Sequence, residues 1–139
     1  MYLKSILPAE IARDAQWSIY ATCDPEGISE LGNFLAEQPA NMRKYATGML
    51  ALLGRVAVTG PQQLPDDLCH QVSKGVWEFI KGRIRVFWFY DEGKVIVCSH
   101  GHIKRTQKTP ASEIMRVEGL IAQYFEAKKK QKIIQIEEE

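Results

Sequence analysis

The spacing of hydrophobic positions changes about halfway along the chain. In the first half, apolar residues recur at steps of three and four over residues 28–35 and 40–53, which is the spacing of amphipathic helices. Asp24 and Pro25 combine an N-cap acceptor with a residue suited to the first helical position, so we expect the first helix to begin there. The two segments together predict a helical hairpin.

The second half shows short extended runs in place of the helical spacing. Ahead of the hairpin, residues 17–22 are rich in β-branched and aromatic residues and predict a first strand. After a loop that contains glycine and proline, four runs are separated by short polar or glycine-containing turns, and these runs are residues 69–73, 76–81, 83–90 and 94–100. Runs of this length with such short connections predict an antiparallel meander.

The remaining segments complete the expected architecture. Thr109 and Pro110 predict the start of a closing helix, whereas the blocks of like charge in residues 128–139 indicate a flexible tail. Residues 1–16 form an N-terminal extension, for which a short helix is one interpretation. We therefore expect an α+β domain at residues 17–127, in which the helices lie on one side of an antiparallel sheet that is mostly a meander.

Composition narrows the class of protein. A chain of 139 residues with 45% hydrophobic residues matches one domain with a single core. It contains neither an apolar run near the roughly 20 residues of a membrane span nor a signal-peptide pattern, so we expect a cytoplasmic protein. The three cysteines are widely spaced and form no CxxC pair, which argues against a disulfide framework or a structural metal site and favours free thiols.

The net charge of +1 hides an uneven distribution along the chain. Lys and Arg outnumber Asp and Glu by 8 to 3 in residues 74–108, whereas the ratio is 5 to 8 in residues 1–73 and 5 to 6 in residues 109–139. A basic segment within a nearly neutral protein favours a phosphate-bearing partner that binds at one place. The alternative is an ordinary solvated strand edge, where lysine is common.

Arg85 is the first candidate for a functional residue. Alternation along the run 83–90 places Arg85 on the same face as Phe87 and Phe89. An isolated charge among apolar residues is costly, so the guanidinium must either pair with a buried acid such as Glu78 or face a cleft. The pattern of residues leaves both alternatives open.

Residues 76–110 carry a recognisable pattern. Their sequence, VWEFIKGRIRVFWFYDEGKVIVCSHGHIKRTQKTP, resembles the phage-derived branch of the RelE/HigB toxin family, in which a run LWEL…R.FYFF..G..IVLLHGF.KKTQKTP is characteristic. The resemblance extends more weakly over residues 17–125. It implies a RelE-like fold and a toxin that acts as a ribosome-associated messenger RNA endoribonuclease, without a cofactor.

The resemblance also implies partners and leaves alternatives. Such toxins are usually encoded beside an antitoxin that neutralises them, and we expect a helix-turn-helix protein in this role. The same fold also occurs in ParE-type toxins that inhibit DNA gyrase without cutting RNA. A descendant that has lost activity and serves only as a binding module is the third alternative.

Cleavage of RNA through its own 2′-hydroxyl needs no metal ion, because positioned cations and proton-transfer groups are enough. The resemblance to the RelE/HigB family implies that Arg85 binds the scissile phosphate. Three further cations precede the predicted closing helix and are expected to cradle phosphates, namely Lys104, Arg105 and Lys108. Gln107 is either a spacer or a ligand of the RNA sugar, and a solvated basic loop is the alternative for the whole segment.

His100 and His102 are the candidates for the general acid or base, because histidine titrates near neutral pH. The register of the two neighbouring strands decides which residue faces Arg85. A tight hairpin places Ser99 opposite Arg85, and one additional loop residue places His100 there. For either histidine, a structural role in the turn around Gly101 is the alternative.

Further RNA contacts are expected from Lys81, Arg83 and Trp77. Trp77 either stacks on a base or belongs to the core. The chain departs from the better-known RelE branch in one respect: lysines stand on the strand that matches residues 76–80 in that branch, whereas Glu78 sits there among apolar residues in this chain. This difference weakens the transfer of a lysine base from that branch.

Overall fold

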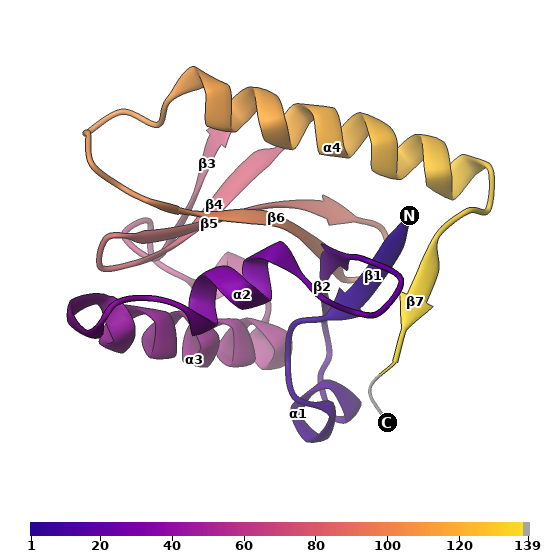
Figure 1. The fold of residues 1–139 in the computed structure, drawn as a ribbon, viewed down its shortest axis with the longest axis horizontal. Coiled ribbons are helices and arrows are strands. Elements are labelled where there is room, and N and C mark those ends of the chain that lie inside the picture. Colours follow the sequence, from indigo (N-terminus) through magenta and orange to yellow (C-terminus); the bar gives the residue numbers. More distant parts are fainter. Residues whose placement is uncertain (138–139) are drawn as a thin grey trace.

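The computed structural model describes residues 1–137, and over these residues the chain forms a mixed seven-stranded sheet with helices on both faces (Figure 1). The strands lie in the order β3-β4-β5-β6-β2-β1-β7. Their bounds are Tyr2–Ser5 for β1, Ser18–Cys23 for β2, Cys69–Ser73 for β3, Val76–Lys81 for β4, Ile84–Asp91 for β5, Val95–Ile103 for β6 and Ile134–Ile136 for β7. The helices are α1 (Ala9–Arg13), α2 (Glu30–Ala36), α3 (Arg43–Thr59) and α4 (Ala111–Lys129), with short 3₁₀ turns at Ala40–Met42 and Pro61–Gln63.

The predicted meander is confirmed, since β3, β4, β5 and β6 pair in sequence and antiparallel. The rest of the sheet differs from the expectation of an antiparallel arrangement. β2 pairs with β6 in parallel and β1 pairs with β7 in parallel, so the sheet is mixed. Of the N-terminal extension, the short helix is present as α1, whereas β1 was not predicted.

The first helix begins later than its sequence suggests. The side-chain Oδ1 of Asp24 accepts hydrogen bonds from the backbone N–H groups of Glu26 and Ile28, both at 2.9 Å, and so closes a turn in place of capping a helix. The cap belongs to Ser29, whose Oγ accepts from the Gly32 N–H at 3.0 Å. The prediction of a helix start at Asp24 is therefore wrong, because the N-cap lies five residues later, at Ser29.

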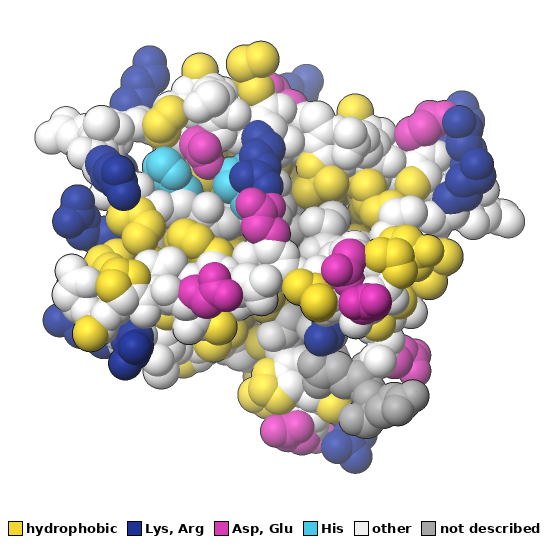
Figure 2. Space-filling model, in the orientation of Figure 1, with side chains coloured by type: hydrophobic (Ala, Val, Ile, Leu, Met, Phe, Trp, Pro, Cys, Tyr) yellow, Lys and Arg dark blue, Asp and Glu magenta, His cyan; other side chains and the backbone are white. Residues whose placement is uncertain are grey.

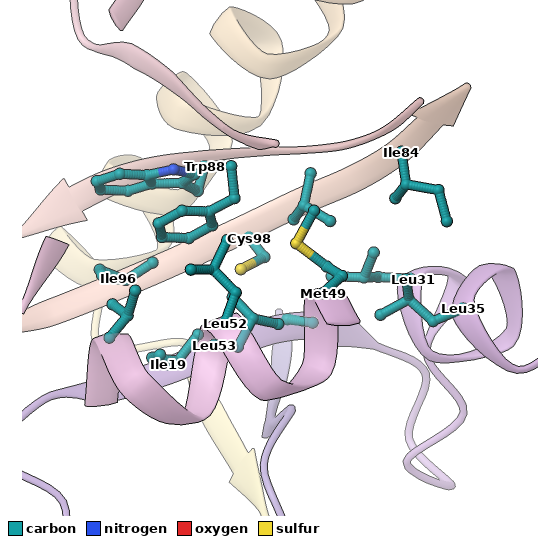
Figure 3. Close-up of a cluster of buried hydrophobic side chains, with 14 of the residues drawn as sticks. Ile19, Leu31, Leu35, Met49, Leu52, Leu53, Ile84, Trp88, Ile96 and Cys98 are labelled. Atoms are coloured by element: carbon teal, nitrogen blue, oxygen red, sulfur yellow. The ribbon is translucent and has the colours of Figure 1, made fainter. Parts of the chain in front are cut away.

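Helices cover both faces of the sheet, so the prediction that they all lie on one side is wrong. The reason lies in β5, whose first six residues are all buried and therefore need an apolar cover on each face. α2 and α3 cover one face, where Trp88, Met49, Leu53 and Ile19 belong to one buried apolar cluster (Figure 3). α4 covers the opposite face, where its buried residues Val117 and Tyr124 belong to a second apolar cluster together with Phe87 and Phe89 of β5.

The C-terminal segment takes part in the sheet, in contrast to the flexible tail expected for residues 128–139. α4 continues to Lys129, and β7 then pairs in parallel with β1, with Ile134 opposite Tyr2. Glu138 and Glu139, the last residues of that expected tail, lie outside the described residues.

No helix in residues 1–137 combines the length and the apolar character that a membrane crossing requires.

Candidate functional site

A cavity of about 450 Å³ lies at the end of the sheet, where β4 turns into β5 and where β6 ends. Its walls are formed by Gly82, Arg83, Arg85, Lys104, Arg105, Thr106 and Gln107. The two segments are joined by the backbone, because the Lys104 N–H donates to the Arg83 carbonyl at 2.8 Å, and by the Arg83 Nε, which donates to the Lys104 carbonyl at 3.3 Å. Four cationic side chains and no carboxylate line the cavity, which is the composition of an anion-binding site.

The turn that forms one wall depends on Gly82. This residue has a φ of +57°, in the left-handed region, and a Cβ atom placed on it would lie 2.2 Å from a ring carbon of Tyr45. Any other residue at this position would strain the turn and collide with α3. The close approach keeps the neighbouring Arg83 and Arg85 at the end of the sheet.

Arg85 is held rigidly at the cavity wall with only 8% of its surface exposed. Its Nη1 donates to the carbonyls of Gly82 at 2.7 Å and of Ile84 at 3.2 Å, whereas its buried Nε has no hydrogen-bond partner. The Nε lies 3.7 Å from the Oε1 of Glu78. Burial lowers the pKa of Arg85, and the Glu78 carboxylate opposes that shift. Both alternatives for Arg85 are thus partly met, since it contacts a buried acid and also lines a cleft.

Glu78 is the most deeply buried charged residue at the site, with 1% of its surface exposed. Its Oε1 lies 3.0 Å from the Nε2 of His70, and its Oε2 has no hydrogen-bond partner. Burial raises the pKa of Glu78, and the nearby positive charges of His70 and Arg85 oppose this effect. A buried carboxylate with one unpartnered oxygen is costly, so its retention in the fold points to a role other than stability.

Sequence reasoning missed His70, which is far from the basic stretch. Ser73 pairs with Val76 at the β3–β4 turn, and a bulge between Gln71 and Ser73 shifts the register by one residue, which places His70 opposite Glu78. The sequence offers one signal, a polar residue on each of two adjacent strands. It does not reveal the bulge that brings the two side chains together.

The register between β5 and β6 differs from both sequence-based alternatives. His102 lies opposite Arg85, in place of Ser99 or His100. Two features cause the difference, a hairpin loop longer than expected and a bulge in the β6 segment that faces Val86 to Trp88. The backbone on the far side of the bulge packs tightly, because a Cβ on Gly101 would lie 2.2 Å from the Phe34 ring.

The two histidines of β6 have different surroundings. His100 is 2% exposed, and both ring nitrogens are engaged, Nδ1 with the Ser99 Oγ at 2.9 Å and Nε2 with the Glu113 Oε2 at 2.6 Å. Burial lowers the pKa of His100 in spite of the hydrogen bond with Glu113. The side chain of His102 is 25% exposed, and its Nδ1 lies 3.6 Å from the same Glu113 oxygen. His102 is therefore the histidine that is better placed to exchange a proton with a ligand.

The remaining candidates divide between the cavity and other surfaces. The structure brings Arg83, Lys104, Arg105 and Gln107 to the cavity with Arg85. Lys108 is exposed outside the lining, and its carbonyl accepts a hydrogen bond from the Thr106 hydroxyl.

Trp77 and Lys81 lie on the opposite face of the sheet. Trp77 stacks on Trp88 with ring centroids 5.6 Å apart, within the apolar cluster under α3. The aliphatic part of Lys81 packs against Gly48 of α3. Strand alternation explains this placement, because Trp77, Phe79 and Lys81 point away from the face that carries Glu78.

The surface near the N-terminal part of α4 carries charges of both signs. Figure 2 shows histidine side chains at the surface beneath α4, with acidic and basic side chains beside them. Arg116 of α4 forms an ion pair with Glu30 of α2 across the edge of this region. Within residues 1–137, no group of three or more His, Cys, Asp or Glu side chains is arranged to hold a metal ion.

Comparison with known proteins links the chain to a family. The family model described as "Phage derived protein Gp49-like (DUF891)" matches residues 33–121, which is more than half of the chain. The matched region runs from within α2 into α4 and includes every residue of the cavity wall. No curated protein matches the sequence.

Proposed function

Since the chain belongs to the Gp49-like family of phage-derived proteins, we propose that it is a toxin of the RelE/HigB type, with a RelE-like fold, that cleaves messenger RNA on the ribosome. Two features support this proposal. The motif of residues 76–110 resembles that of the phage-derived RelE/HigB branch. The same residues build a cavity whose walls carry four cations.

The observation that carries the proposal is the state of Arg85. A buried guanidinium that is fixed by two backbone carbonyls, with no hydrogen bond to its Nε, lies at the wall of a cationic cavity. Fixed donors of this kind stabilise charge that develops on a phosphate, because they need no reorganisation during the reaction. A cation that served only stability would be expected on the surface or in a fully bonded pair.

The chemistry proposed for the cavity is attack of a ribose 2′-hydroxyl on the adjacent phosphorus. His102 takes the 2′ proton, and the new P–O bond forms as the 5′-oxygen leaves. Arg85, with Lys104 and Arg105, stabilises the negative charge of the phosphorane. The leaving oxygen takes a proton from Lys104 or from water, and the products are a 2′,3′-cyclic phosphate and a free 5′-hydroxyl.

Induced expression in a bacterial host tests the proposal. Growth should stop, and the 5′ ends of translated messages should show discrete new cleavage sites. The Arg85→Ala variant should lose both effects, whereas Arg116→Ala, which removes an exposed arginine outside the cavity, should retain them. Intact messages together with inhibited DNA supercoiling by gyrase would contradict the proposal and favour a gyrase-inhibiting toxin.

We further propose an antitoxin as the partner of the chain. A protein that neutralises the toxin is expected to be encoded by a neighbouring gene and to carry a helix-turn-helix. Co-expression of that neighbour should restore growth and should yield a complex that co-purifies with the chain. Growth arrest that persists despite soluble co-expression would contradict this part.

A further inference from the structure

The contact between His70 and Glu78 has the geometry of an ion pair, which depends on one proton. The Nδ1 of His70 lies 3.2 Å from the carbonyl oxygen of Asp66, and because a carbonyl only accepts, this nitrogen carries a hydrogen. A neutral imidazole has only one N–H, so its Nε2 would present a lone pair to the carboxylate oxygen 3.0 Å away. Two unprotonated acceptors repel at this distance, so a stable contact needs one additional proton, on the imidazole or on the carboxyl group.

The shared proton fixes the charge of the pair. Whether it resides on the imidazole or on the carboxyl group, the pair of His70 and Glu78 is neutral overall. Loss of the proton gives the pair a charge of −1 beside the Arg85 guanidinium, whose Nε is 3.7 Å from the same Glu78 oxygen. Because burial raises the pKa of Glu78, protonation at this place is favoured by the surroundings as well as by the contact.

We propose that His70 and Glu78 act as positioning residues that hold one shared proton, and that this proton keeps the charge of Arg85 available to a phosphodiester in the cavity. This inference rests on the proposed function only in its choice of ligand. With the proton present, Arg85 faces the anion without a net counter-charge. Without it, Glu78 neutralises Arg85 and weakens binding.

The position of His70 suits this role. His70 lies on the edge strand β3 and its side chain is 39% exposed, so it exchanges protons with solvent, whereas Glu78 is sealed within the sheet. The other groups whose charges act on Glu78 are Arg85 of β5, His102 of β6 and Lys104, which follows β6. Among the charged groups of residues 1–137 that act on Glu78, His70 is the one whose nitrogen lies within 3.5 Å of the carboxylate.

Binding and protonation are then linked reciprocally. An anion bound at Arg85 adds negative charge beside Glu78 and so raises the proton affinity of the pair, and by linkage the proton strengthens anion binding by the same factor. Couplings of this kind between adjacent sites change affinity by about 5-fold to 150-fold. We expect at least about a five-fold loss of affinity between pH 6 and pH 8.5.

The test measures the affinity of the full chain for a 2′-O-methyl RNA oligonucleotide, which binds without being cut, by fluorescence anisotropy at constant salt over this pH range. The two key variants should change affinity in opposite directions. His70→Ala leaves the Glu78 carboxylate to neutralise Arg85 and should weaken binding several-fold at pH 6. Glu78→Gln removes the counter-charge and should bind more tightly than the wild type at pH 8.5, with little dependence on pH.

Matched control variants show whether the pH dependence of binding comes from His70 and Glu78 or from other residues nearby. Gln71→Ala, an exposed change on the same edge strand, and Glu92→Gln, an exposed carboxylate on the β5–β6 turn, should both keep the pH dependence of the wild type. Thermal melts confirm that each variant is folded. If both key variants weaken binding equally, the two residues serve only to maintain the structure, and the inference is overturned while the proposed function stands.

A second measurement needs no ligand. The ring resonances of His70, recorded by NMR at pH 6, should differ between Glu78→Gln and the wild type, because the substitution removes the charged partner of the ring. An unchanged ring spectrum would overturn the inference. If the wild type failed to bind the oligonucleotide at every pH, the proposed function would fail, and the role of the proton in anion binding would fail with it.

Discussion

The two faces of the sheet differ in the kinds of residues that they bury. Under α2 and α3 the buried cluster contains 20 residues, all of them apolar, and its centre holds Trp88 stacked on Phe79 with ring centroids 4.7 Å apart. Under α4 the apolar cluster contains seven residues, and the end of that face next to the start of α4 buries Glu78, Arg85 and His100. One face is thus a complete core, and the other contains polar groups that are costly to bury.

The difference suggests that the face under α2 and α3 supplies most of the stability and that the polar end of the other face carries the functional site. Polar groups removed from water cost free energy unless they are fully bonded, and charged groups cost the most. Glu78 and Arg85 each keep a buried atom without a partner, whereas the other such atoms in residues 1–137, Gln38 Oε1 and Trp88 Nε1, belong to neutral side chains. Eleven large apolar side chains are fully buried in addition to this pair, so we expect the core to be stable without it. Departures from the rules of packing are expected at functional sites.

The largest effect on stability is expected from the face under α3. Phe79→Ala removes a fully buried ring that stacks on Trp88, and it should lower the free energy of unfolding by about 3–5 kcal/mol. Denaturation by urea measures the change. Val58→Ala, an exposed change on α3, serves as the control and should have almost no effect. A small loss for Phe79→Ala would mean that this face is not the main core.

The buried pair on the other face is expected to separate activity from stability. Replacing both Glu78 and Arg85 with leucine should leave the free energy of unfolding unchanged or raise it by about 1–4 kcal/mol, because two buried charges are exchanged for apolar groups. RNA cleavage should fall by about 10²–10³-fold, because a fixed charge-stabilising group is lost. Retained cleavage, or a protein that no longer folds, would contradict the division between the two faces.

The strands and helices of the two faces were predicted from the sequence more accurately than the way in which they pair and pack. The meander strands have the expected limits within a few residues, because alternation and turn residues are local properties of the chain. β1 escaped prediction, since its stability comes from pairing with β2 and with β7, at the other end of the chain. The partner of Arg85 also escaped prediction, because the bulge between β5 and β6 lies where Gly101 approaches Phe34 of α2, a contact that local alternation does not reveal.

For the site as well, residues that are close together in the sequence were predicted, and a residue from a distant strand was missed. Arg83, Arg85, Lys104 and Arg105 cluster in the sequence and meet in the cavity, as their strand and loop positions suggested. His70 comes from a different strand, and only the β3–β4 bulge places it against Glu78. Residues that are brought together by register shifts are not visible in the pattern of a single sequence.

A smaller effect is expected at the other end of the face under α4, where Asp91 anchors the helix. Asp91 accepts hydrogen bonds from Tyr124 at 2.5 Å and from Lys128 at 2.8 Å. Although burial alone would raise it, these hydrogen bonds lower the pKa of Asp91 below its ordinary 3.8. A lowered pKa in the folded state contributes stability that is fully present above the unfolded value and is lost as the pH falls through the folded value.

Asp91→Asn should therefore destabilise the protein by about 1–3 kcal/mol at neutral pH. The difference from the wild type should shrink as the pH is lowered below about 3.8, where the wild-type carboxylate becomes protonated. Urea denaturation between pH 2.5 and pH 7 measures this. A difference that stays constant over that range would show that the charge of Asp91 does not stabilise the helix.

The smallest effect is expected on the solvent side of α4. Lys130 and Glu126 form an exposed ion pair at 3.0 Å with a spacing of four residues. Glu126→Ala should change the free energy of unfolding by no more than about 0.5 kcal/mol, because such pairs are screened by water and salt. The same denaturation experiment measures it, and a loss above 1 kcal/mol would show that surface pairs contribute more than the account assumes.

The most direct test of the central claim uses ribosomes programmed with a message that carries a single 2′-deoxynucleotide at a mapped cleavage position. We expect the purified chain to cut the unmodified message there, to leave a 2′,3′-cyclic phosphate, and to leave the 2′-deoxy message uncut, because the attacking hydroxyl is absent. Cleavage of both messages at the same position and rate would contradict an attack by the 2′-hydroxyl in the Arg85 cavity.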